Sequence, residues 1–312
     1  MIEKEVIVIG SGPAGYTASI YLARAMLEPL LFEGFSADGT PGGQLMKTSL
    51  VENFSGFSAI EGQTLMYEIR RQAINNGVKC VMVDVISLEK FENKFILTDS
   101  NEIQYSAKAV IVATGTKVRR LELKSEEEFW MKGISACAVC DGGLPIFRNK
   151  TIAVIGGGDS AAEEAIYLTK FAQEVYLIHR RDKLRASKIM QKHLIKNPKI
   201  KILYNKIPVE FYGGNLLEGM KIKDVYTDEI SDLSVSGCFE AIGNIPNTKL
   251  LKNFLDLDEN GYIITDKNNM SSVDGVFAAG DVMSPHYRQA IIAAGNGAKA
   301  ALACEKRLLD KE

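Results

Sequence analysis

The apolar residues of this chain gather in short runs that alternate with stretches of helical spacing. Residues 5–9 and 29–32 are apolar runs, and between them residues 16–27 carry apolar side chains at every third or fourth position. Short apolar runs predict buried strands, whereas the wider spacing predicts a helix with one buried face. The start of the chain therefore predicts a strand, a helix and a second strand in succession.

A long loop follows, and then the alternation resumes. Residues 34–56 are rich in glycine and polar residues. After them come a helical pattern over 62–75, short strands over 79–108 and a buried strand over 109–115 that stops at a glycine. The Gly42–Gly43 pair can be a simple turn, but a loop this long between regular elements is more often functional.

The second half of the chain repeats this order. Residues 152–155 and 175–178 are apolar runs that flank a helical pattern. Residues 239–247 repeat the strand-to-glycine ending, and residues 275–282 form another apolar run with an acidic tip. A helix rich in small residues is expected over about 289–308. The repetition predicts two related α/β units.

A glycine motif follows the first strand of each unit. A G-x-G-x-x-G motif allows a tight turn, close approach of a pyrophosphate and close helix packing, with the anion at the helix N-terminus. Glu33 follows the first motif at the end of the second strand, where such units hydrogen-bond a ribose hydroxyl. The residues of the two motifs are Gly10, Ser11, Gly12, Pro13, Ala14 and Gly15 in the first unit, and Gly156, Gly158, Asp159, Ser160 and Ala161 in the second.

The second unit has basic residues where the first has Glu33. His179, Arg180 and Arg181 end its second strand, and Arg185 follows shortly after. Guanidinium groups bind a 2′-phosphate that a carboxylate would repel, so this exchange favours NADP over NAD. The alternative is a solvated surface cluster, which is common for arginine. The position in the unit favours the phosphate site, and we assign FAD to the first unit and NADPH to the second.

The pair Cys137 and Cys140 lies just ahead of the second glycine motif. Two thiols separated by two residues can cycle between dithiol and disulfide. Half of a zinc site is the alternative, but it needs two more ligands. None of the other cysteines and histidines pairs with another at short spacing, so we expect no metal site. They are Cys80, Cys238, Cys304, His179, His193 and His286.

Composition narrows the class of protein. Lysine and arginine number 37 against 39 aspartate and glutamate, so no basic field indicates nucleic acid. Five cysteines at irregular spacing are no secreted disulfide framework. The chain enters its first strand directly after residues 1–4, without room for a signal peptide, and no apolar run approaches the ~18 residues of a membrane span. We expect a soluble, cytoplasmic protein.

With these motifs assembled, the chain resembles the low-molecular-weight thioredoxin reductases over essentially its full length. The segments that carry the resemblance are 10–15, 42–45, 52–54, 113–115, 135–141, 156–161, 179–181, 280–282 and 287–290. The resemblance implies an α/β homodimer with two Rossmann-like three-layer dinucleotide-binding domains. In it a NADPH domain, about 117–245, is inserted into a FAD domain made of 1–116 and 246–312.

The resemblance also implies roles for single residues in electron transfer from NADPH through FAD to oxidised thioredoxin. Cys140 lies against the flavin, Cys137 attacks the disulfide of thioredoxin, and Asp141 manages the protons. The inserted domain rotates about crossings near 114–116 and 244–247 between the two half-reactions. Beyond the motif residues already named, the resemblance marks as cofactor-binding Gly43, Gln44, Leu45, Asn53, Ala113, Thr114, Gly115, Ile242, Gly243, Gly280, Asp281, Arg288, Gln289 and Ala290.

Three other functions fit part of the pattern. A flavin-dependent dithiol oxidase or a ferredoxin-fed reductase on this scaffold would not need the second glycine motif with its arginines. A non-catalytic redox sensor would leave two cofactor sites and Asp141 without a use. Many bacterial members carry aromatic residues just after the C-x-x-C-D-G segment that help to bind thioredoxin. This chain has Gly-Leu-Pro-Ile-Phe over residues 143–147 instead, which bears on the choice of thioredoxin partner.

Overall fold

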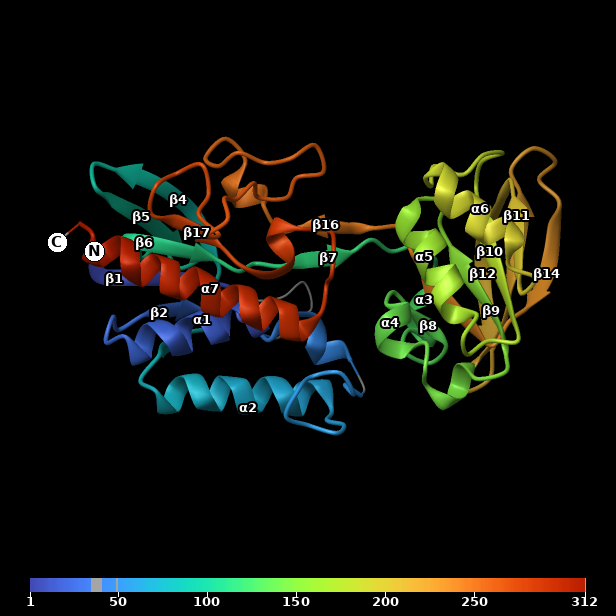
Figure 1. The fold of residues 1–312 in the computed structure, drawn as a ribbon, viewed down its shortest axis with the longest axis horizontal. Coiled ribbons are helices and arrows are strands. Elements are labelled where there is room, and N and C mark those ends of the chain that lie inside the picture. The colour runs from blue at the N-terminus through green and yellow to red at the C-terminus, as the bar shows by residue number, and fades with distance from the viewer. Residues whose placement is uncertain (35–40, 49, 312) are drawn as a thin grey trace. The chain divides into compact units, whose positions relative to one another are not determined.

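The chain forms two compact units, each with its own parallel sheet. The computed structural model describes residues 1–34, 41–48 and 50–311 (Figure 1). Unit 1 comprises Met1–Lys117 and Ile245–Glu312, and unit 2 comprises Val118–Asn244. Unit 2 is therefore inserted in the sequence of unit 1. Residues 35–40 and 49 of the expected loop over 34–56 lie outside the described part of the chain.

Unit 1 is built on a mixed sheet. The sheet has the order β3-β2-β1-β6-β5-β4, and β17 also pairs with β6. Strands β3, β2, β1, β6 and β17 are parallel, whereas β5 runs antiparallel to both β6 and β4. Its elements are β1 (Ile2–Ile9), α1 (Pro13–Arg24), β2 (Leu30–Phe32), η1 (Gly43–Lys47), α2 (Gly62–Asn75), β3 (Lys79–Val81), β4 (Val85–Phe91), β5 (Lys94–Asp99), β6 (Gln104–Val112), η3 (Lys249–Leu251), β17 (Val276–Ala278), η4 (Gly280–Met283) and α7 (Ala290–Leu309).

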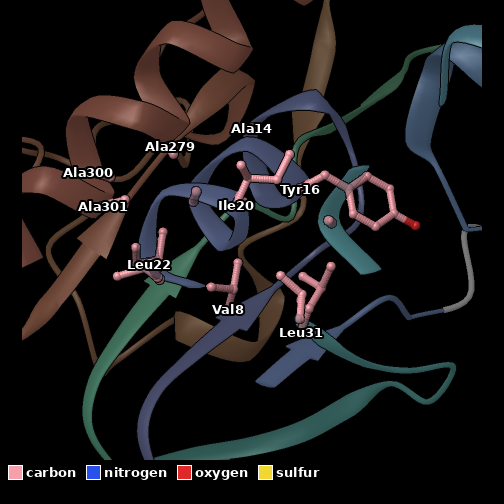
Figure 2. Close-up of a cluster of buried hydrophobic side chains, with 14 of the residues drawn as sticks. Val8, Ala14, Tyr16, Ile20, Leu22, Leu31, Ala279, Ala300 and Ala301 are labelled. Carbon is pink, nitrogen blue, oxygen red and sulfur yellow. The ribbon is translucent and has the colours of Figure 1, made fainter. Parts of the chain in front are cut away.

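Apolar side chains cover both faces of this sheet because successive strand residues point to opposite sides. On β1, Val6 and Val8 join the core beneath α1, α2 and α7, whereas Ile7 and Ile9 join the core on the other face. Figure 2 shows the first of these cores, with Val8 and Leu31 from the strands facing side chains of α1. Residues of β4, β5 and the segment after η3 close the second core.

Unit 2 is built on a parallel sheet with the order β11-β10-β9-β15-β8, beside an antiparallel sheet β12-β13-β14. Its elements are α3 (Glu126–Phe129), β8 (Ile134–Ser135), α4 (Ala138–Asp141), η2 (Pro145–Phe147), β9 (Thr151–Ile155), α5 (Asp159–Leu168), β10 (Glu174–His179), α6 (Lys188–Lys196), β11 (Ile200–Tyr204), β12 (Lys206–Gly213), β13 (Leu217–Asp224), β14 (Ile230–Ser234) and β15 (Gly237–Glu240). Strands β7 (Thr116–Val118) and β16 (Asn244–Pro246) each contain residues of both units.

The parallel sheet of unit 2 also has a core on each face. Ile152 and Val154 of β9 face α5 and α6, whereas Ala153 and Ile155 face the antiparallel strands β12 and β13. Each unit is thus layered, with helices on one face and mainly strands or irregular segments on the other. The α/β fold class with two parallel-sheet units confirms the expectation from the sequence.

Two paired strands carry the chain across the boundary between the units. Strands β7 and β16 form a two-stranded sheet. On one side of them Asn247 donates its amide to Thr114 O at 2.8 Å, and on the other side Arg119 N–H donates to Gly243 O at 3.0 Å. Within the described residues, no helix is long and apolar enough to span a membrane.

Candidate functional site

The first glycine loop is shaped by two glycines that no larger residue could replace. Gly10 has a φ of +112°, and a Cβ there would lie 2.3 Å from the carbonyl oxygen of Ala113, which directly follows the neighbouring strand β6. A Cβ on Gly15 would lie 1.7 Å from Gly10 O. Strand β1 can therefore turn sharply into α1 only because both residues lack a side chain. This packing explains the first and third glycines of the motif.

The middle glycine of the motif leaves open space. No described atom lies within 4 Å of the position that a Cβ on Gly12 would take. Pro13 begins α1 directly after it, so free backbone N–H groups and the positive end of the helix dipole meet this space. Gly42 N–H donates to Ser11 Oγ at 2.9 Å and closes a second loop against the first. The geometry fits the pyrophosphate of a dinucleotide.

Glu33 is more tightly held than its position in the motif predicts. Its carboxylate accepts hydrogen bonds from Tyr16 Oη at 2.6 Å and from Arg70 Nε at 2.6 Å, and its side chain has no exposed surface. Ser11 Oγ donates to the Glu33 carbonyl at 2.7 Å. Burial and the hydrogen bond to Glu33 raise the pKa of the Tyr16 phenol. The binding of a ribose hydroxyl by Glu33 stays a prediction.

Other predicted cofactor residues of unit 1 meet in pairs. Gln44 donates its amide to Thr116 O at 2.8 Å, and Asn53 donates its amide to Gln289 Oε1 at 3.0 Å, across 236 positions in the sequence. A Cβ on Gly43 would lie 3.6 Å from Gly12 Cα, so the loop of η1 reaches the first glycine loop.

The acidic tip after β17 is enclosed. Burial raises the pKa of Asp281 to about 6, and the positive charge of Arg288 acts in the opposite direction. Gly280 before it has a φ of +79°, and a Cβ there would lie 2.9 Å from Ala14 Cβ in α1. Helix α7 begins at Ala290, directly after Arg288 and Gln289. The predicted residues 288–290 therefore lie at the N-terminus of this helix.

The second glycine loop repeats the geometry of the first. A Cβ on Gly156 would lie 2.6 Å from Ala241 O, as one on Gly10 would meet Ala113 O, and no described atom lies within 4 Å of a Cβ on Gly158. Helix α5 begins at Asp159, directly after the open position. Ala161 takes the place of the third glycine and is fully buried. This loop likewise fits a pyrophosphate.

The arginine segment is attached to this loop by backbone hydrogen bonds. Gly157 O accepts from Arg185 N at 2.7 Å and from Ala186 N at 3.0 Å. Asp159 Oδ1 accepts from Ser187 N at 2.8 Å. The segment that carries the arginines is thus held beside the glycine loop rather than free of it.

His179 and the arginines differ in exposure. The imidazole is 6% exposed and donates from Nε2 to Lys183 O at 3.0 Å, and burial lowers its pKa. Arg180, Arg181 and Arg185 are exposed. The structure therefore offers the three guanidinium groups to a ligand, and His179 supports the glycine loop from inside.

The cysteine pair forms a disulfide in unit 2. Cys137 and Cys140 are bonded, with Cys137 ahead of α4 and Cys140 within it. Cys140 N–H donates to Cys137 Sγ at 3.2 Å. Cys140 is exposed and Cys137 half-buried, whereas Cys238 and Cys304 are free and buried. Among the described residues, no three His, Cys, Asp or Glu side chains gather closely enough to hold a metal ion.

Asp141 is buried directly after the disulfide. It is 5% exposed, its Oδ2 accepts a short hydrogen bond from Ser135 Oγ, and its Oδ1 has no partner in the described part of the chain. Burial raises the pKa of Asp141, and the Ser135 hydrogen bond acts against this rise. A carboxyl group with a raised pKa, one residue after the second cysteine of a disulfide, is suited to hold and release a proton.

Several residues of these sites escaped prediction from the sequence. Ser135 stands in the motif before Cys137 but had no assigned role, and Gly157 was an unconstrained position of its motif. Tyr16 was read only as a core residue of the first helix. Arg70 is one of two adjacent arginines on α2, and nothing in its neighbours indicates Glu33 as a partner. The three consecutive glycines at 156–158 were the only available signal.

Comparison with known proteins gives consistent matches over the whole chain. Residues 4–297 match the family model described as pyridine nucleotide-disulphide oxidoreductase. The thioredoxin reductase of Chlamydia pneumoniae is 51% identical over 99% of this chain and 100% of its own. That of Yarrowia lipolytica is 49% identical over the full length of both chains.

Solved structures agree with these relatives. A thioredoxin reductase from Giardia duodenalis superimposes with a TM-score of 0.93 at 40% identity, covering 99% of this chain and 100% of its own. One from Streptococcus pyogenes gives a TM-score of 0.91 at 37% identity over 99% of both chains. Both solved structures therefore share the fold of this chain over nearly their entire length.

Proposed function

Because the chain belongs to the pyridine nucleotide-disulphide oxidoreductase family, among its thioredoxin reductases, we propose that it reduces oxidised thioredoxin with electrons from NADPH. The observation that carries this proposal is the Cys137–Cys140 disulfide beside the buried acid Asp141, in a chain with two nucleotide-binding loops. The enzyme is a thioredoxin-disulfide reductase.

The family implies a flavin and a pyridine nucleotide, and we assign FAD to unit 1 and NADPH to unit 2. When bound, NADPH supplies a hydride and FAD relays its two electrons to the disulfide. In support of FAD in unit 1, the open position at Gly12 faces the start of α1. In support of NADPH in unit 2, Gly158 is open in the same way and three exposed arginines lie on the attached segment.

Within unit 1, we assign the diphosphate of FAD to the backbone of the first glycine loop. Asp281, which has a raised pKa, and Arg288 would hold polar groups of the cofactor near the start of α7. The remaining residues proposed to line the FAD site are Glu33, Gly43, Gln44, Leu45, Asn53, Ala113, Thr114, Gly115, Gly280, Gln289 and Ala290.

Within unit 2, Ser160 and Ala161 would approach the NADPH diphosphate at the start of α5. Arg180, Arg181 and Arg185 would bind the 2′-phosphate, for which bidentate guanidinium groups are suited. Asp159 and His179 would hold the two halves of this site together through the contacts with Ser187 and Gly157. Ile242 and Gly243 complete the proposed NADPH site.

The disulfide turns over by thiol–disulfide exchange. Two electrons open the Cys137–Cys140 bond, and two protons are needed to form the dithiol. Cys137 then attacks the disulfide of thioredoxin as a thiolate, and Cys140 attacks the resulting mixed disulfide, so that reduced thioredoxin leaves. Asp141 supplies and recovers a proton in these steps, for which its raised pKa suits it.

The disulfide and the NADPH loop both belong to unit 2, whereas FAD is assigned to unit 1. Each must reach the flavin in turn, so we propose that unit 2 rotates about the crossing strands β7 and β16 between half-reactions. Gly115 and Gly243 next to these strands have φ angles of +64° and +101°. We further propose the domain boundaries 1–116, 117–245 and 246–312, a homodimer and a cytoplasmic enzyme.

Anaerobic titration of the flavin-containing protein tests the function. NADPH should bleach the flavin absorbance at a much lower concentration than NADH, and oxidised thioredoxin should then restore it. A C137S variant should still be bleached by NADPH but fail to pass electrons to thioredoxin, because the attacking thiol is missing. If NADPH leaves the flavin oxidised and a small dithiol reduces it instead, the protein is a dithiol oxidase.

A further inference from the structure

Ser135 is the first residue of the redox motif, which runs to Asp141. It ends strand β8, which pairs in parallel with β15, and it is 2% exposed. Cys137 follows two residues later and Asp141 ends helix α4. A hydroxyl at a strand end in the interior needs hydrogen-bond partners, because an unsatisfied buried polar group is costly.

The Ser135 hydroxyl finds both partners within the motif. It donates to Asp141 Oδ2 and accepts from Cys137 N–H at 3.1 Å. The motif is closed further by Asp141 N–H, which donates to Cys137 O at 3.0 Å. One serine therefore connects the backbone of the attacking cysteine with the carboxyl group that serves the sulfur atoms.

The two oxygens of Asp141 are consequently unequal. Oδ2 is occupied by the serine hydroxyl, whereas Oδ1 is buried without a partner among the described residues. A proton on Oδ2 would compete with the Ser135 O–H for the same oxygen, but a proton on Oδ1 would not. Since burial favours the neutral acid, a proton is easily accommodated on Oδ1.

We propose that Ser135 is a positioning residue that fixes Asp141 through Oδ2 and so makes Oδ1 the oxygen that carries the proton. This inference rests on the proposed function. When two electrons from the reduced flavin open the disulfide, Asp141 gives its Oδ1 proton to one sulfur atom and is reprotonated from water. The other sulfur remains a thiolate or takes its proton from water.

The structural alternative is that Ser135 only holds the backbone of Cys137. The two roles differ in what they do to the titration of Asp141. A hydroxyl that donates to the carboxylate stabilises its charged form, so its loss must raise the pKa of Asp141 further. A serine that only accepts from a backbone N–H would leave that ionisation unchanged.

The test is the pH dependence of kcat/KM for oxidised thioredoxin at saturating NADPH, measured with S135A, S135T and wild type. In S135A we expect the ionisation assigned to Asp141 to move upward by about one to two pH units, because a hydrogen bond to a charged group is being lost. S135T keeps the hydroxyl and should keep the wild-type profile.

Two further variants separate the explanations. Ser125 Oγ also accepts from a backbone N–H, that of Phe211 at 2.8 Å, in the same unit. S125A is therefore the matched control and should not shift the profile. In D141N the ionisation should be absent, and adding S135A to it should cause no further change, because Ser135 acts through Asp141.

The outcomes are distinct. A wild-type protein that does not reduce thioredoxin would overturn the proposed function. If the wild type reduces thioredoxin and the pH profile of kcat/KM for S135A superimposes on the wild-type profile, the role of Ser135 is overturned. A second readout needs no change at Ser135: the infrared difference spectrum between wild type and D141N, both in the disulfide form. It should show the protonated carboxyl band of Asp141, and its absence would contradict the proposal.

Discussion

A Cβ atom on Gly157 would lie 2.2 Å from Nδ1 of His179, so the second glycine of the loop and the last residue of β10 are in direct contact. The imidazole cannot retreat easily, because it is buried and its Nε2 is bonded to Lys183 O at 3.0 Å. Gly157 O in turn accepts from Arg185 N. The glycine loop and the arginine segment therefore form one continuous structure around Gly157.

We expect Gly157→Ala to weaken the binding of NADPH. The new methyl group would displace the His179 ring and with it the arginine segment, so KM for NADPH should rise roughly tenfold, equivalent to about 1.4 kcal/mol, with little change in kcat. Steady-state kinetics and flavin content check this. Gly214→Ala is the control, since the nearest atom to its Cβ is Glu218 Oε1 at 3.6 Å. Unchanged KM in Gly157→Ala would show that the contact has no part in binding.

Substitution of Arg180 or Arg181 by Gln should reduce the preference for NADPH over NADH. Each guanidinium lost from a phosphate removes a charged hydrogen bond of about 1.5–3 kcal/mol, so KM for NADPH should rise by tenfold or more while KM for NADH stays constant. The ratio of the two kcat/KM values measures the effect. Lys188→Gln, an exposed cation at the start of α6, provides the control. Equal losses with both nucleotides would place these arginines outside the phosphate site.

Gly243→Ala and Gly115→Ala should slow turnover without loss of flavin. No described atom lies within 4 Å of a Cβ at either position, so the effect comes from backbone strain at positive φ, worth roughly 1–2 kcal/mol. Such strain beside β7 and β16 should hinder the proposed rotation. Stopped-flow and steady-state rates check this. Gly77 has a φ of +90° and equally open space, away from both crossing strands, so Gly77→Ala should lower stability but not kcat.

Glu240→Gln should stabilise the protein more at pH 8 than at pH 5. Glu240 is 2% exposed, and burial together with the charge of Glu126 raises its pKa to about 9. Because the folded pKa lies above the unfolded value of about 4.3, the stability that Glu240 contributes is present at low pH and lost as pH rises toward 9.

Glutamine does not titrate, so it escapes this loss. The difference in free energy of unfolding between the variant and the wild type should grow by on the order of 1–3 kcal/mol between pH 5 and pH 8. Denaturant unfolding at both pH values measures it. Glu218→Gln changes an exposed carboxylate of the same unit and should give no such pH dependence. A constant difference for Glu240→Gln would mean that the acid is already ionised at pH 5.

Local patterns in the sequence were sufficient for the two strand–glycine–helix units. The apolar runs and the glycine spacing act over a few neighbouring residues, and the structure has β1, α1 and β2, and again β9, α5 and β10, close to the expected positions. The pairing of Cys137 with Cys140 is local in the same sense. Structure that depends on residues close together in the chain can therefore be predicted from the sequence.

Contacts across the fold were decided by tertiary structure alone. Arg70 on α2 meets Glu33 37 positions away, and Asn53 meets Gln289 236 positions away. His179 was grouped with the arginines by sequence, yet it is buried beneath Gly157 while they are exposed. Such contacts depend on which strands pair and which face a side chain takes. The sequence by itself therefore determined which reactive and charged side chains this protein has. Only tertiary packing decided which of them are buried, which are hydrogen-bonded and which are exposed.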